Sequence, residues 1–128
     1  RPGRERTAFH WEVAPEELLP LLQRLRDDYQ CAPMVITENG ATYEDVLSSD
    51  GRIHDVERLA YFQRHLHVVR QAVESGIDVR GYFAWSLLDN FEWAEGYSRR
   101  FGLVHVDFET QQRRIKDSGL WFRDFLLA

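Results

Sequence analysis

The sequence predicts an α/β fold built around parallel strands. Two apolar runs, residues 34–37 and 77–85, are rich in β-branched and aromatic side chains and are bounded by polar residues and glycine, as buried strands are. Between them, residues 55–76 carry apolar side chains three and four positions apart, which is the spacing of an amphipathic helix. A strand, a helix and a strand in this order form a right-handed parallel βαβ unit.

The composition is that of one ordinary domain. The chain has 128 residues, 44% hydrophobic and 13% aromatic, which is enough for a hydrophobic core. Its formal net charge is −5, and no basic run exceeds the pairs at 99–100 and 113–114, so we expect neither a nucleic acid nor a membrane surface as a partner. The sequence shows no membrane-span pattern and no signal-peptide core at its start, so we expect a cytoplasmic protein.

Individual residues add three expectations. Cys31 is the single cysteine and is expected to be a small buried or half-buried residue. The five histidines show no paired-ligand spacing, so we expect no metal and no other cofactor. The single methionine, Met34, falls inside the first predicted strand, so we expect the chain to be a piece of something longer.

The first helix is expected in the leucine-rich stretch before that strand. Residues 15–17, Pro-Glu-Glu, place a helix-opening proline beside acids that favour the positive end of the helix dipole. Because Pro20 would break an interior hydrogen bond, we expect the regular helix to begin near Leu19, with the proline in its first turn. Residues 41–53, rich in Asp, Ser and Gly, predict an irregular surface loop.

The second helix has the clearest boundaries. Asp55 is predicted to cap its start, and Gly76 to end it. Its buried face is expected to consist of the regularly spaced apolar residues Leu59, Phe62, Leu66, Val69 and Val73.

The remaining chain predicts one more extended segment and one more helix. Residues 102–108 are expected to be extended, and residues 109–112 resemble a turn. The last helix is expected to be capped near Asp117 or Ser118 and to carry the apolar residues Leu120, Trp121, Phe125 and Leu126.

Carboxylates and indoles follow the two predicted strands. Glu38 comes directly after the first strand, and Trp85 and Glu92 come at and after the end of the second. In a parallel sheet both positions lie at the carboxyl edge, where catalytic groups collect. Carboxylates beside aromatic faces favour a carbohydrate site over a phosphate site, because Glu92 would repel a phosphate and the sequence has no glycine-rich phosphate loop.

A simpler interpretation remains open at this point. Glu38 could be a surface loop residue beside a turn glycine. The aromatic residues Phe83, Trp85, Phe91 and Trp93 could equally be ordinary core.

Three segments carry a resemblance to a known family. Residues 36–40 (Ile-Thr-Glu-Asn-Gly), 80–93 (Arg-Gly-Tyr-Phe-Ala-Trp-Ser-Leu-Leu-Asp-Asn-Phe-Glu-Trp) and 96–103 (Gly-Tyr-Ser-Arg-Arg-Phe-Gly-Leu) closely resemble the β-glucosidases of glycoside hydrolase family one. The resemblance extends from about Trp11 to the end of the chain. It implies an α/β fold that is the C-terminal portion of a (β/α)₈ TIM barrel, namely the last two βα units and the preceding helix. Residues 1–128 would then be a single incomplete domain.

The same resemblance implies a role for five residues. Glu38 matches the nucleophile of a retaining glycosidase, which forms the covalent glycosyl-enzyme. Trp85 matches the indole under the sugar, and Glu92 the carboxylate that accepts hydrogen bonds from its 4- and 6-hydroxyls, which points to an unphosphorylated sugar. Trp93 matches an indole that donates to a neighbouring hydroxyl, and Phe101 an aromatic wall of the same pocket.

One departure limits what the resemblance implies. Family members take their acid/base glutamate from an Asn-Glu-Pro motif, and residues 1–128 contain no such motif. We therefore expect a hydrolase of β-glucosides whose isolated chain is inactive and whose partners are a β-glycoside and the missing N-terminal barrel portion. An inactive remnant, a sugar-binding fragment and one chain of a split enzyme remain as alternatives.

Overall fold

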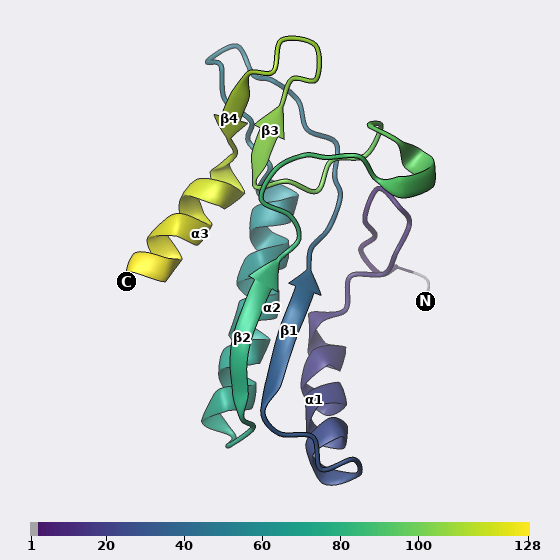
Figure 1. Ribbon diagram of the computed structural model, residues 1–128, viewed down its shortest axis with the longest axis vertical. Helices are drawn as coiled ribbons and strands as arrows, with labels where there is room; N and C mark the ends of the chain where they lie inside the picture. The colour runs from purple at the N-terminus through teal and green to yellow at the C-terminus, as the bar shows by residue number, and fades with distance from the viewer. Residues whose placement is uncertain (1–2) are drawn as a thin grey trace.

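The computed structural model describes residues 3–128, which form a parallel two-stranded unit flanked by helices, with a hairpin at one end (Figure 1). In chain order the elements are η1 (Pro15–Glu17), α1 (Leu18–Asp27), β1 (Met34–Asn39), α2 (Val56–Glu74), β2 (Val79–Ala84), η2 (Trp93–Glu95), β3 (Val104–Val106), β4 (Arg113–Ile115) and α3 (Asp117–Leu127).

The predicted βαβ unit is confirmed. Strands β1 and β2 pair in parallel, with Val35 opposite Gly81 and Ile36 opposite Tyr82, and α2 connects them. Strand β1 extends two residues beyond its predicted end, so that it includes Glu38 and Asn39. Both strands point toward the end of the molecule that carries the β3–β4 hairpin and the loop with η2 (Figure 1).

The first helix forms as expected. A short 3-10 turn over Pro15–Glu17 leads into α1, and Pro20 lies in the first turn of that helix. The face that includes Leu22 packs against Met34 and Ile77, and so ties α1 to the lower end of the sheet.

The buried face of α2 is rotated from the predicted one. Phe62 and Val69 are buried as expected, but Leu59 and Leu66 are half-buried and Val73 is exposed. Two polar residues lie on the buried face, and each is internally hydrogen-bonded, which the apolar pattern does not reveal. The buried face consists of Arg58, Tyr61, Phe62, His65, Val68, Val69 and Ala72.

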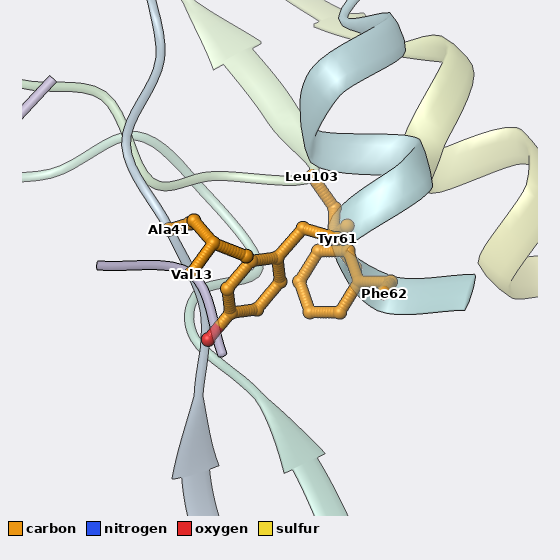
Figure 2. Packing of buried hydrophobic residues seen from close by; sticks show 5 residues of the cluster. All are labelled: Val13, Ala41, Tyr61, Phe62 and Leu103. Atoms are coloured by element: carbon orange, nitrogen blue, oxygen red, sulfur yellow. The ribbon is translucent and has the colours of Figure 1, made fainter. Parts of the chain in front are cut away.

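The core beside the sheet ends draws on distant parts of the chain. Val13, Ala41 and Leu103 surround Tyr61 and Phe62 of α2 (Figure 2). The N-terminal segment, the chain after β1 and the chain before β3 therefore meet on α2. Their burial stabilises the carboxyl end of the sheet, where both strands stop.

A hairpin near the C-terminus was only half predicted. The extended segment at 102–108 contains β3, but it pairs antiparallel with β4, whose three residues Arg-Arg-Ile show no alternation that predicts a strand. The carboxylate of Asp107 accepts main-chain N–H groups of Glu109 and Thr110 and so stabilises the connecting turn. Helix α3 starts at Asp117, but its N-cap residue is Lys116 and no side chain caps it, so the cap expected near Asp117 or Ser118 does not form.

The expectation that Cys31 is buried or half-buried is wrong. Its side chain is exposed, because it lies in the turn between α1 and β1 rather than beneath either element.

One face of the sheet is uncovered. Helix α2 lies behind the two strands, and within residues 3–128 no element lies over the face toward the viewer (Figure 1). Val35 and Phe83 both lie against Gly81 on this face, yet they are 48% and 60% exposed. The outer backbone edges of both strands are unpaired among the described residues. Open edges beside apolar side chains favour pairing with another chain.

We therefore expect the isolated chain to self-associate at concentrations on the order of 10 μM, measured by sedimentation velocity. Val35→Lys should reduce this association, because it places a charge on the open face. Val73→Lys is the matched control, since Val73 is similarly exposed, at 49%, but lies on α2. A compact monomer at that concentration, or equal effects of the two variants, would contradict the prediction.

Candidate active site

A cleft of about 450 Å³ lies at the carboxyl ends of β1 and β2. Its lining includes every residue selected from the sequence: Glu38, Trp85, Glu92, Trp93 and Phe101. Glu38 is near the end of β1, whereas the other four belong to the chain that follows β2. Residues more than sixty positions apart thus meet at one place because the strands are parallel neighbours.

The backbones that carry Glu38 and Trp85 are held together closely. The main-chain N–H of Trp85 donates to the carbonyl oxygen of Asn39 over 2.8 Å. A Cβ atom at Gly40 would lie 1.8 Å from the carbonyl oxygen of Trp85, so only glycine fits at that position. Gly40 is therefore required for the contact between the two strand ends.

The two carboxylates in the cleft are available to a ligand. Glu38 is exposed and Glu92 is half-buried. Among the residues that the structure describes, neither side chain forms an ion pair or a hydrogen bond. This sets them apart from most acidic residues of this chain, which are bound to arginine or lysine.

Trp93 is presented to solvent by a tight turn. The main-chain N–H of Glu92 donates to the carbonyl oxygen of Gly96 over 2.7 Å, which closes the turn around η2. Trp93 has φ 43°, a left-handed conformation that is uncommon for a bulky residue, and it is 83% exposed. Trp93, Phe91 and Phe83, the last two 60% exposed, are therefore not packed into a core formed by residues 3–128.

A group of buried charges holds the loop between Trp85 and Phe101. We call Asp45, Asp55, Arg58, Asp89 and Lys116 the ion cluster; their side chains have no exposed surface. Arg58 donates to Asp45 over 2.8 Å and to Asp55 over 2.6 Å, and Lys116 donates to Asp89 over 2.8 Å and also to Asp45.

Asp89 connects this cluster to the cleft. It lies in the loop between Trp85 and Glu92, and its carboxylate also accepts from the guanidinium of Arg100 over 2.7 Å and from the main-chain N–H of Gly102. Burial alone would raise the pKa of Asp89, but Lys116 and Arg100 hold the pKa of this carboxyl below its usual value. The loop is thus fixed by a charged residue that stays ionised.

Asp55 has a different role from the predicted one. It occupies the N-cap position of α2, but its side chain makes no capping hydrogen bond. Its carboxylate accepts instead from Arg58 and from the hydroxyl and main-chain N–H of Ser118, which joins the starts of α2 and α3.

Sequence reasoning assigned no site role to the four other residues that line the cleft: Trp11, Asn39, Gly40 and Tyr61. Trp11 stacks on Phe9 with ring centroids 5.0 Å apart and an interplanar angle of 22°. A pair of aromatic residues two positions apart in an otherwise polar lead-in was the signal that could have identified it. Tyr61 could not have been identified in this way, because it belongs to a helix that is buried along one side.

No group of three or more His, Cys, Asp or Glu side chains within residues 3–128 could hold a metal ion. No helix in the described chain is long and apolar enough to cross a membrane.

Two unpaired carboxylates among indole and phenyl faces, at the carboxyl edge of parallel strands, define a site of the type that sugar-hydrolysing enzymes use. The model of glycosyl hydrolase family 1 matches residues 1–128, and the chain belongs to this family.

Named relatives agree with the family assignment. β-Glucosidase A of Thermotoga maritima is 50% identical over 117 residues, covering 91% of this chain and 26% of that protein. The 6-phospho-β-galactosidase 1 of Streptococcus pneumoniae is 40% identical over 126 residues, covering 96% of this chain and 27% of that protein. The chain thus spans about a quarter of the length of these curated relatives.

A solved structure shows the same arrangement of elements. The β-glucosidase from Thermotoga maritima in complex with deoxynojirimycin matches with a TM-score of 0.95 and 46% identity, covering 98% of this chain and 29% of that one. The parallel unit described here is therefore part of a (β/α)₈ barrel.

Proposed function

We propose that this chain is the C-terminal portion of a retaining β-glucosidase and that it carries the nucleophile and half of the sugar site. The observation that supports this most strongly is the convergence of Glu38, Trp85, Glu92, Trp93 and Phe101 on one cleft. Its family membership makes hydrolysis of a glycosidic bond the expected chemistry.

In this proposal Glu38 attacks the anomeric carbon. The carboxylate is unpaired among residues 3–128, exposed to the cleft and fixed at the end of a strand, as a nucleophile requires. Attack forms a glycosyl-enzyme ester at Glu38 while the bond to the leaving oxygen breaks, and water later hydrolyses the ester with overall retention. The leaving oxygen must receive a proton from a second carboxyl group about 5–5.5 Å from the nucleophile.

Glu92 is assigned to sugar recognition rather than to proton transfer. It lies in the loop that also carries Trp85 and Trp93, so its carboxylate can accept hydroxyl hydrogen bonds while the indoles cover the C–H faces of the ring. The acid/base glutamate would then come from the portion of the barrel that residues 1–128 do not contain. This makes that portion the second expected partner, beside the β-glycoside.

The Glu92 carboxylate also bears on which sugar is accepted. One relative is named as a 6-phospho-β-galactosidase, so family membership does not by itself distinguish a phosphorylated from an unphosphorylated sugar. A carboxylate at the position that meets the 6-hydroxyl would repel a phosphate there. We therefore propose an unphosphorylated β-glycoside as the substrate.

The test uses a joined protein, in which this chain replaces the stretch that it matches in Thermotoga maritima β-glucosidase A. Glu38→Gln should reduce kcat at least about a thousandfold, because the nucleophile is lost. Glu92→Gln should lower kcat/KM by about 10- to 100-fold, because the hydrogen bonds to a charged acceptor are weakened. Glu95→Gln is the control, since Glu95 lies in the same loop, pairs with Arg99 and does not line the cleft.

The anomeric configuration of the first product, followed by proton NMR, reports retention directly. An active Glu38→Gln variant, or an inverted product, would contradict the proposal. A joined protein that binds deoxynojirimycin without turnover would support the alternative of a sugar-binding remnant.

A further inference from the structure

Asn39, the residue after Glu38, makes an unusual set of contacts. Its main-chain oxygen accepts the N–H of Trp85 over 2.8 Å, and its side-chain Oδ1 accepts the hydroxyl of Tyr82 over 2.6 Å. Tyr82 belongs to β2 and Trp85 directly follows that strand. A single residue therefore joins the carboxyl ends of β1 and β2.

These contacts occur where the regular pairing of the strands is interrupted. The register of β1 against β2 shifts between Ile36 and Asn39, which is the stretch that contains Glu38. An irregular ladder leaves the end of a two-stranded sheet less well fixed than its middle. The hydrogen bonds of Asn39 lie at the first paired position after this shift, one residue beyond Glu38.

Tyr61 of α2 lines the same cleft as Asn39. Its ring is 8% exposed within the core cluster, and its hydroxyl is directed toward the chain that continues from the tip of β1 (Figure 2). Burial raises the pKa of Tyr61, and a side-chain hydrogen bond with Asn39 opposes that shift. Burial likewise raises the pKa of Tyr82, so both phenols keep their protons at neutral pH.

We infer that Asn39, held by Tyr82 and by the main chain of Trp85, is a positioning residue that sets the placement of Glu38 relative to Trp85. Glu38 is exposed to the cleft, whereas the side-chain oxygen of Asn39 accepts a hydrogen bond from Tyr82 of β2, so the two adjacent residues have different roles. A nucleophile displaced by about 1 Å can lose on the order of 100-fold in rate. The inference rests on the proposed function, because it assigns Asn39 to the same reaction.

The test compares four variants of the joined protein on dinitrophenyl β-glucoside. Tyr82→Phe should lower kcat about 10-fold and Asn39→Leu about 100-fold, with KM changed less than about threefold. Asn39→Asp keeps an oxygen that can accept from Tyr82 and should recover most of the kcat lost in Asn39→Leu. Tyr43→Phe is the control, because it removes a phenol that donates to Glu5 over 3.3 Å and does not line the cleft.

A second measurement does not depend on turnover. Hydrogen exchange at the main-chain N–H of Trp85 should become at least about 10-fold faster in Asn39→Leu and Tyr82→Phe, but not in Tyr43→Phe, because its acceptor is the carbonyl of Asn39. Unchanged exchange at Trp85, or equal kcat in Asn39→Leu and the control, would overturn the inference. Activity that persists in Glu38→Gln would instead contradict the proposed function, and the exchange data would still decide whether Asn39 fixes the strand ends.

Discussion

Replacing Lys116 with methionine is expected to lower the free energy of unfolding of the joined protein by about 3–5 kcal/mol. The ammonium group lies between Asp45 and Asp89, and none of the three side chains has exposed surface. Removing the cation leaves two buried carboxylates with one fewer partner each, and the cost of an uncompensated buried charge is large. Urea unfolding, followed by circular dichroism, measures the change.

The matched control is Arg123→Met. Arg123 pairs with Asp124 over 2.6 Å, but the two side chains are 59% and 64% exposed, so its loss should cost no more than about 0.5 kcal/mol. Equal losses of unfolding free energy in the two variants would show that the buried ion cluster contributes no more to stability than an exposed ion pair does.

The same cluster predicts a response to acid. Because the pKa of Asp89 is held below its usual value in the folded protein, its ionised form contributes stability at pH values above the unfolded pKa of about 3.9. That contribution is lost as the pH falls through the lower, folded-state pKa. Lys116→Met removes one of the two cations that lower this pKa, so acid unfolding of the variant should begin at a higher pH.

The second large effect concerns the leaving group. The chain alone should fail to hydrolyse alkyl β-glucosides, whereas the joined protein should hydrolyse them. The rates should differ by about 100- to 10,000-fold or more, because general acid catalysis contributes a factor of that size. An alkoxide is a poor leaving group, so the leaving oxygen of an alkyl glucoside must receive a proton as its bond to the anomeric carbon breaks. In our proposal Glu92 contacts sugar hydroxyls and does not supply this proton. Dinitrophenolate needs little protonation, so any reaction of the chain alone should be confined to the dinitrophenyl glucoside.

The assay compares the two substrates with the chain alone and with the joined protein at matched concentrations. Glu38→Gln in both forms shows whether any residual reaction uses the proposed nucleophile. Efficient hydrolysis of alkyl glucosides by the chain alone would mean that Glu92, or another acid within residues 1–128, donates the proton.

Much of the fold was determined by local pattern. The two apolar runs, the helical spacing between them and the position of Pro20 predicted β1, α2, β2 and the start of α1. Parallel pairing then placed Glu38 and the residues after Trp85 at one edge, so the cleft could be anticipated from the order of the elements alone. The family motifs supplied the individual roles, which stay predictions until the variants are measured.

Other features depended on contacts between distant residues. The buried face of α2 includes Arg58 because Asp45 and Asp55 neutralise it, and the partners of Lys116 lie 27 and 71 positions away in the sequence. Strand β4 exists because β3 pairs with it, and the side chain of Asn39 is held by a hydrogen bond from Tyr82, 43 positions away. The sequence determined β1, β2 and the helices, since apolar spacing is local. Only the tertiary structure decided the pairing that forms β4 and where polar side chains are buried, because a buried charge or amide is stable only beside a partner that folding brings to it.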